Sequence, residues 1–223
     1  MLEAWEFIVR RPELLAEWVL AHLWIIFVAI VVAVVLGVVI GVFITGKGRE
    51  QIADTALYLA EIVMTIPSLA LFGLLMLLLG DIGLKAIGFL PAVIALIVYG
   101  QLPILRNTYT AIQAVDPAMV EAGRGMGMNE RQILFKIKLP LAIPVIMADL
   151  RNSIVLVIGI ATIAAVIGAG GLGVPIFRGL RNARMDFILI GGISVSILAL
   201  LVDGLMALVE RRITPKGLRA SRQ

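Results

Sequence analysis

Residues Val115 to Pro140, VDPAMVEAGRGMGMNERQILFKIKLP, form a polar stretch between two long apolar regions. We call this stretch the polar segment. Asp116 stands before Pro117 at its start. An aspartate oxygen can accept an unpaired N–H of the first helical turn, where proline has none, so the pair predicts the start of a helix. Gly125 and Gly127 predict that this helix ends and that the chain turns.

A second helix is predicted in the other half of the polar segment. Asn129 can cap it, with Gln132 three residues later reaching back as in a capping box. Leu139-Pro140 is expected to stop it, because the residue before a proline avoids helical geometry. The polar segment is therefore predicted to be a helix, a glycine turn and a helix.

A helix-turn-helix with basic residues suits either DNA recognition or the docking of a protein partner. A DNA-reading module has to be soluble and free to enter a groove. Both ends of the polar segment run within a few residues into long apolar runs. We therefore expect no nucleic-acid binding and favour a surface between membrane spans that docks a soluble partner.

The composition indicates an integral membrane protein. Hydrophobic residues make up 61% of the 223 residues and charged residues 15%, whereas soluble domains carry about 25% charged residues. Long uncharged runs favour an all-α bundle, because a β-barrel would show short alternating segments. The chain has no cysteine and one histidine, His22, which excludes thiolate and His-rich metal sites. No cofactor is expected in this chain.

About five transmembrane helices are predicted. They cover approximately residues 19–44, 57–79, 86–105, 139–177 and 187–209. Residues 1–18 are expected to be an extracytoplasmic or interfacial segment, residues 19–210 the transmembrane domain, and residues 211–223 a basic tail. For the fourth span, one long helix that enters the membrane obliquely from the polar segment is preferred to a short surface helix followed by a span.

Individual side chains mark irregular positions in these spans. Pro67 lacks an N–H and is expected to kink the second span. Glu61 is a candidate functional carboxylate within the membrane, although we favour a position at the headgroup level. Arg106 is expected to close the third span. Asp149 and Arg151 are two residues apart, so they point to different helix faces and need partners elsewhere.

Glycine patterns give one packing prediction and two motif matches that we reject. Ala33, Gly37 and Gly41 recur every four residues and predict close helix packing. The stretch GVFITGK (41–47) fits the start of a phosphate-binding loop but lacks the Ser or Thr that would follow. GAGGLGVPIFRG (168–179) contains GxGxxG without a βαβ context, so a re-entrant or extramembrane loop is expected there.

The basic residues predict the orientation. With five crossings, most of them fall on one face, in the loop after the first span, the polar segment with its flanks, and the tail. The positive-inside rule then places the polar segment and the C-terminus in the cytoplasm and the N-terminus outside. Three arginines run against this rule, Arg178, Arg181 and Arg184.

The polar segment resembles a motif of a known family. Glu121-Ala122-Gly123, Gly127 and Ile137-Lys138-Leu139-Pro140 match the EAA loop, EAA-x3-G-x9-I-x-LP, of binding-protein-dependent ABC importer permeases. The spacing fits at every step. The one departure is Gly123 in place of alanine, which is expected to loosen the helix by about 1 kcal/mol. LPILRNTYTAI (102–112) and IGAGGLG (167–173) resemble the glycine betaine, carnitine and choline branch of osmoprotectant importers.

This resemblance implies a type I permease fold in a bacterial or archaeal inner membrane, with a cytoplasmic coupling helix-turn-helix. It implies two ATP-binding cassette subunits that hold ATP and Mg²⁺, a second permease copy or a related permease, an extracytoplasmic substrate-binding protein, and surrounding lipid. The turn that docks on the ATPase would consist of Glu121, Ala122, Gly123 and Gly127. The anchor to the membrane would consist of Ile137, Leu139 and Pro140.

The translocation path has few markers in the sequence. A quaternary ammonium is bound by cation–π contacts with aromatic rings, and few aromatic residues fall in the middle of the predicted spans. The selective cage is therefore expected on the binding protein. Candidate lining residues are Met64, Phe72 and Tyr99, and structural packing is the alternative role for each.

Three other functions remain open at the level of sequence. One is an importer of the same class for amino acids such as methionine. An ion-coupled secondary transporter would use Glu61, Asp149 or Asp203, but such proteins often carry internal repeats, and we find none here. A structural membrane scaffold would bind no ATPase.

Overall fold

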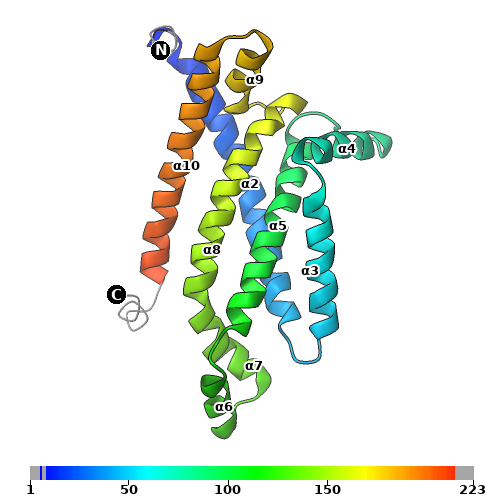
Figure 1. Cartoon of the computed structure of the whole chain (residues 1–223), viewed down its shortest axis with the longest axis vertical. Helices are drawn as coiled ribbons and strands as arrows, with labels where there is room; N and C mark the ends of the chain where they lie inside the picture. Colours follow the sequence, from blue (N-terminus) through cyan, green and yellow to red (C-terminus); the bar gives the residue numbers. More distant parts are fainter. Residues whose placement is uncertain (1–5, 7–8, 214–223) are drawn as a thin grey trace.

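The computed structural model describes residues 6 and 9–213, and every regular element within them is helical (Figure 1). Four stretches are long and apolar enough to cross a membrane, namely α2 (Pro12–Ile44), α5 (Phe89–Gln113), the continuous Glu130–Ile167 and α10 (Met185–Ile213). The all-α membrane bundle is therefore confirmed. Helix α2 begins already at Pro12. Predictions for residues 1–5 and for the tail from residue 214 onward fall outside the described residues.

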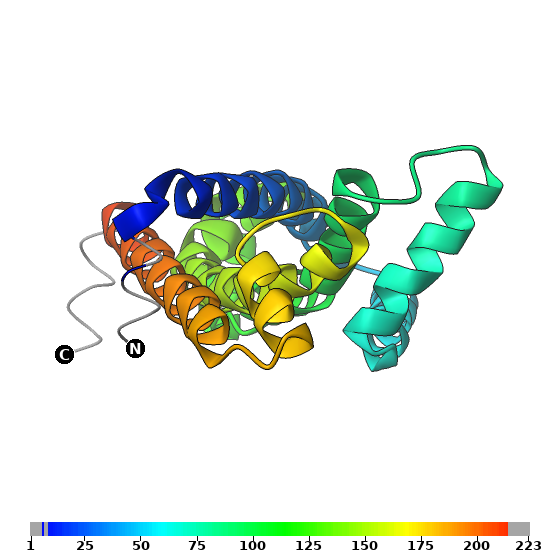
Figure 2. The ribbon, with the colours of Figure 1, turned by 90° about the horizontal axis from the view of Figure 1, so that it is seen from above.

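The predicted second span is two helices rather than one kinked helix. α3 (Glu50–Thr65) and α4 (Ser68–Asp81) meet at an angle of 99°. Ile66 is extended because it precedes Pro67, so the helix stops there. The hydroxyl of Tyr99 donates to the carbonyl of Ile66 at this break. In Figures 1 and 2, α4 runs across one end of the bundle and points away from it.

The third span continues past the residue that was expected to close it. α5 runs to Gln113, so the prediction that Arg106 ends the span was wrong. Arg106 is accommodated within the helix because its guanidinium pairs with Glu61 of α3, with 2.6 Å between Nη2 and Oε1. The charge of Arg106 therefore indicates an ion-pair partner on another helix and not the end of the span.

The second half of the polar segment leads without interruption into the fourth span. α6 (Pro117–Gly125) and α7 (Glu130–Ile133) are followed by a π-helical turn, η1 (Leu134–Lys138), and by α8 (Leu139–Ile160). The prediction that Leu139-Pro140 stops the second helix was wrong. Proline cannot donate to the carbonyl four residues back and its ring crowds it, and a wider π turn directly before Pro140 relieves that conflict. The preferred single long helix is confirmed.

The end of the bundle opposite the polar segment is closed by glycine-rich chain. A 3-10 helix, η2 (Ala161–Ile167), leads through glycines into α9 (Gly173–Arg181), so the predicted loop 168–179 is half helical. His22 is fully buried here, with Nε2 3.2 Å from the carbonyl oxygen of Ile158. A Cβ on Gly171 would lie 2.8 Å from His22 Nδ1, so only glycine lets the chain pass over the imidazole.

Helices α2 and α5 share the most extensive contact between two elements in the described part of the chain. A Cβ on Gly37 would lie 2.6 Å from Ile104 Cγ2, and one on Gly41 would lie 2.7 Å from Thr108 Cβ. Ala33 faces Gly100 of α5 in the same way, at 3.2 Å. The predicted stripe of small residues is therefore confirmed as a packing surface. Because Gly41 to Ile44 are helical, the rejected phosphate-loop match is also excluded by the fold.

Candidate functional site

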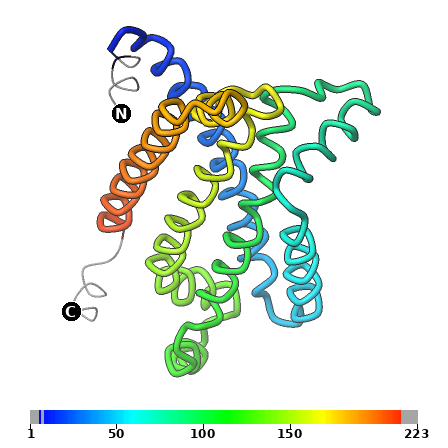
Figure 3. Tube along the Cα trace, turned by 45° about the horizontal axis from the view of Figure 1, so that its top comes forward, coloured from blue at the N-terminus to red at the C-terminus, as the bar shows by residue number. Residues whose placement is uncertain are grey.

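The polar segment projects from the end of the bundle opposite α9. Figures 1 and 3 show α6 below the membrane-crossing helices, separated from the splayed α4 by the length of the bundle. α6 joins α5 through a short connection and, through α7 and η1, α8. A force applied to α6 would therefore act directly on the ends of two spans.

Both helix starts in the polar segment have the predicted caps. Asp116 Oδ1 accepts the backbone N–H of Ala118 at 2.9 Å. Asn129 Oδ1 accepts the N–H of Gln132 at 2.9 Å, while Gln132 Oε1 accepts the N–H of Asn129 at 2.8 Å. The capping box is thus complete. Such caps typically stabilise a helix by about 1 kcal/mol each.

The turn between α6 and α7 is fixed by backbone geometry and by one ion pair. Gly127 has φ +79°, a left-handed conformation that favours glycine, as expected for the matched position. Met128 N–H donates to the carbonyl of Gly123 at 3.1 Å. Arg124 Nη2 lies 3.2 Å from Glu130 Oε1 across the turn. These contacts hold α6 and α7 in one arrangement.

Gly123, the one departure from the family pattern, lies on the side of α6 that packs against the second half of the polar segment. It is buried, and a Cβ placed on it would lie 2.6 Å from Ile137 Cδ1 and 3.5 Å from Met128 Sδ. A side chain at this position would therefore have to displace the end of the Ile137 side chain. Ile133, only 1% exposed, completes this small core with Val120.

The outer face of α6 is exposed and partly apolar. Glu121 and Ala122 are exposed there. Met119 and Met126 leave 49% and 74% of their surface accessible. Methionine side chains adapt to varied partner surfaces. The exposure of these methionines was not predicted from the sequence. The signal that marks them is a methionine in, or directly after, a short capped helix whose buried positions are already taken by Val120 and Gly123.

The predicted anchor residues lie where the polar segment enters the membrane-crossing bundle. Ile137 is in η1, and Leu139 and Pro140 open α8; all three are half-buried. The docking residues Glu121 to Gly127 and these anchor residues are therefore brought together in one unit. Their roles in docking and anchoring stay predictions.

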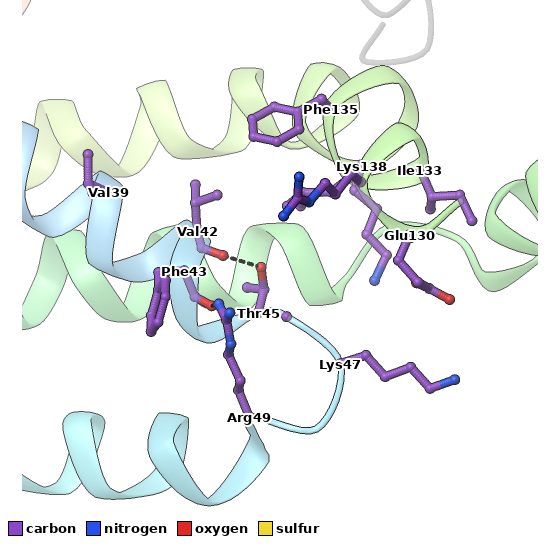
Figure 4. A pocket seen from close by; sticks show the side chains of 13 residues that line it. Val39, Val42, Phe43, Thr45, Lys47, Arg49, Glu130, Ile133, Phe135 and Lys138 are labelled. Carbon is purple, nitrogen blue, oxygen red and sulfur yellow. Dashed lines mark hydrogen bonds between the residues drawn. The ribbon is translucent and has the colours of Figure 1, made fainter. Parts of the chain in front are cut away.

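A hollow of about 480 Å³ lies beside this unit, between the end of α2 and η1 (Figure 4). Val42 and Phe43 line it from α2, and Phe135 and Lys138 from the opposite side. Arg49 folds back over the α2 terminus, where its Nη1 donates to the Phe43 carbonyl at 2.7 Å and its guanidinium lies 3.8 Å from the ring centroid. This contact closes α2 where it leaves the bundle.

The three candidate path residues cluster near the α3–α4 break. Phe72 is fully buried and Tyr99 is 5% exposed. Met64 is half-buried against the same core. Each packs within this chain, and a role in the translocation path stays a prediction. Among the described residues, no group of three His, Asp or Glu side chains could hold a metal ion.

The membrane carboxylates have different surroundings. Asp203 and Glu210 of α10 pair with Arg151 of α8, with 2.5 Å between Arg151 Nη2 and Asp203 Oδ2 and 3.9 Å between Nη1 and Glu210 Oε2. This confirms that Arg151 finds its partners on another helix. Asp149 has no ion-pair partner among the described residues and is half-buried.

Comparison with known proteins shows to which family this chain belongs. Residues 33–215 match the model of the family described as "Binding-protein-dependent transport system inner membrane component". The chain belongs to this family. It is 44% identical over 173 residues to the carnitine transport permease protein OpuCB of Listeria monocytogenes, covering 78% of this chain and 77% of that one. Identity to the glycine betaine/carnitine/choline permease protein OpuCB of Bacillus subtilis (strain 168) is 41%, covering 91% and 89%.

Solved structures share the fold of this permease. An inward-facing structure of the MetNI methionine ABC transporter aligns with a TM-score of 0.80 over 92% of this chain and 99% of that chain. A crystal structure of an amino acid ABC transporter aligns with a TM-score of 0.79 over 92% and 96%. The sequence identities, 23% and 24%, limit this likeness to the fold. The predicted ABC importer permease fold is confirmed.

Proposed function

We propose that this permease belongs to an ATP-driven importer of osmoprotectants such as glycine betaine, carnitine or choline. The relatives at 41–44% identity are permeases for these compounds. The amino-acid alternative is supported only by structures below 25% identity. An ion-coupled carrier would need free carboxylates, and two of the three candidates, Glu61 and Asp203, are paired with arginine.

Coupling to ATP hydrolysis is proposed to pass through α6. The observation that carries this proposal is that the exposed helix α6 is held by a fixed turn against α7, and that α7 runs through η1 into a long membrane helix without a break. A rigid connection of this kind transmits a push from a soluble domain to the spans. The surface that would contact that domain consists of the exposed Glu121, Met119 and Met126. ATP and Mg²⁺ are assigned to separate subunits.

The assembly follows from the same proposal. Two ATPase subunits would bind the polar segments of two permease copies, identical or related, and an extracytoplasmic binding protein would deliver the substrate at the α9 end. The polar segment and the end of α10 would then face the cytoplasm, and α9 the outside. The basic residues Lys136, Lys138, Arg211 and Arg212 at the polar-segment end support this orientation.

Substitution of Glu121 tests the coupling surface. Glu121→Lys reverses an exposed charge without touching the α6 core, so the permease should fold but lose its ATPase. In co-purification from membranes, we expect ATPase retention to fall about tenfold, equivalent to about 1.4 kcal/mol, and osmoprotectant uptake to fall with it. Glu121→Gln should have a smaller effect.

Gln113→Lys is the matched control. It adds a positive charge to an exposed position at the end of α5, close to α6 but outside it, and should leave ATPase retention unchanged. Normal ATP-dependent uptake by the Glu121→Lys variant with its ATPase still bound would overturn the proposed docking surface.

A further inference from the structure

Helix α3 carries a row of polar side chains along one face. Gln51, Asp54, Tyr58, Glu61 and Thr65 follow one another at intervals of three and four residues. At 3.6 residues per turn these positions fall within an arc of about 80°. We call this row the α3 polar face. Ala53, the only fully buried residue of α3, points to a different side.

The α3 polar face reaches membrane depth. Glu61 lies ~16 Å along the axis from the first residue of α3, at 1.5 Å per residue. α3 runs beside α5, which crosses the membrane (Figure 1). Ionisable side chains at such depth face the interior of a bundle or water, not lipid. This depth argues against the headgroup position that sequence analysis favoured for Glu61.

The α3 polar face opens onto a groove rather than into the core of the chain. A groove of about 540 Å³ is lined by Asp54, Tyr58 and Glu61 of α3 and by Arg106 of α5. The side chains of the Glu61–Arg106 pair remain 42% and 52% exposed, and Tyr58 is 64% exposed. Polar groups this open cannot be satisfied by hydrocarbon, so water or another protein chain has to reach them.

We propose that the α3 polar face and Arg106 line the polar-segment half of the substrate passage and give it weak sites for a small zwitterion or organic cation. This inference rests on the proposed function for the identity of the substrate, but not for the presence of water. Asp54 and Glu61 attract an ammonium group, and the Tyr58 ring face adds a cation–π contact. Arg106 is the matching partner for a substrate carboxylate.

The Glu61–Arg106 pair suits passage rather than storage. When a zwitterion enters between the two side chains, its ammonium group pairs with Glu61 and its carboxylate pairs with Arg106. One ion pair within the protein is then replaced by two ion pairs with the substrate. When the substrate leaves, the two side chains pair again. Both the occupied and the empty states are charge-balanced, which keeps the site from holding its substrate tightly.

Cysteine labelling of the assembled importer tests the passage directly, because the chain has no cysteine of its own. Asp54→Cys, Tyr58→Cys and Thr65→Cys place single thiols on the α3 polar face. Ile52→Cys and Leu59→Cys are matched controls, since these residues are 51% and 56% exposed on another face of α3. The probe is methanethiosulfonate ethyltrimethylammonium, a water-soluble reagent that itself carries a quaternary ammonium.

Thiols on the α3 polar face should react roughly tenfold or more faster than the controls, because only a hydrated thiol forms the reactive thiolate. At Tyr58→Cys, adding Arg106→Gln should slow the anionic sulfonatoethyl reagent and not the cationic one. Retention of the ATPase by each variant shows that it is assembled.

The outcomes separate this inference from the proposed function. If the unmodified importer takes up glycine betaine while the three thiols react no faster than Ile52→Cys and Leu59→Cys, lipid or a second copy covers the α3 polar face and the inference fails alone. If the thiols react as expected but no osmoprotectant is imported, the passage stands and the substrate assignment fails.

Discussion

The contact of α2 with α5 and the contact of α8 with α10 join membrane helices in two different ways. Gly37 and Gly41 let α2 approach Ile104 and Thr108 of α5 so closely that an added Cβ would overlap them. One hydrogen bond, from Gln101 Nε2 to the Ala33 carbonyl at 3.2 Å, accompanies this fit. Between α8 and α10, Arg151 instead reaches two carboxylates, Asp203 and Glu210.

The difference concerns how each contact responds to movement. Interlocked small residues have one register, because sliding would place a branched side chain against a backbone. An arginine with acceptors two turns apart can keep a partner when one helix shifts along the other. α2 and α5 therefore form the fixed part of the bundle. α8, which carries the polar segment, has the more adaptable contact.

The largest expected effect comes from filling the α2–α5 contact. Gly41→Val places branched carbons against Thr108 Cβ and the Leu105 carbonyl, which lie 2.7 and 3.2 Å from the position of the added Cβ. Overpacking of this kind costs about 3 kcal/mol, which corresponds to a fall of roughly 10 °C in the thermal midpoint. Size-exclusion profiles after stepwise heating in detergent measure it.

Gly192→Val in α10 is the control, because a Cβ there meets nothing within 4 Å. The thermal midpoint of this variant should stay close to that of the unmodified protein. An unchanged midpoint for Gly41→Val would mean that α2 and α5 are not in the register described here.

The charged contact should show an intermediate effect and should be recoverable. Arg151→Ala removes the cation that pairs with Asp203 within the membrane, so the midpoint should fall, by less than for Gly41→Val. Arg151→Met combined with Asp203→Leu removes both charges and should recover part of the loss, because apolar pairs can replace ion pairs. The same heating assay compares the variants.

The exchange Arg151→Asp with Asp203→Arg sharpens the comparison further. It should be more stable than Arg151→Asp alone, since the opposite charges meet again. No exchange of this type is expected to recover Gly41→Val. If the exchanged pair were as unstable as the single reversal, the contact would depend on shape as well.

The local parts of this structure could be predicted from sequence. The Asp116 cap and the Asn129–Gln132 capping box each depend on residues two or three positions apart. Both the donor and the acceptor of each hydrogen bond therefore lie within the same short stretch of sequence. The stripe Ala33, Gly37 and Gly41 was predictable for a similar reason. A helix with a periodic flat side has to meet another helix there.

The predictions that failed depend on contacts between residues that are far apart in the sequence. The prediction that Arg106 ends a span fails because its partner, Glu61, comes from another helix. Pro67 was correctly placed as a disturbance, but the 99° bend is supported by packing of Phe72 and by the Tyr99–Ile66 hydrogen bond. At Pro140 the helix continues through a π turn. The exposure of Met119 and Met126 also required the fold of α6 on η1.

The smallest expected effect concerns a single hydroxyl in the α2–α5 contact. Thr108 is fully buried, and its Oγ1 has no hydrogen-bond partner within residues 6 and 9–213. Thr108→Val keeps the branched shape that faces Gly41 and removes an unsatisfied donor, so it should stabilise the permease by about 1 kcal/mol, or roughly 2–4 °C in the thermal midpoint.

Thr110→Val is the control. The exposed Thr110 hydroxyl already donates to the Arg106 carbonyl at 3.0 Å, so its removal should not stabilise the protein. A lower midpoint for Thr108→Val would show that its hydroxyl is satisfied in the assembled protein, and that polar bonding contributes more to the α2–α5 contact than its shape indicates.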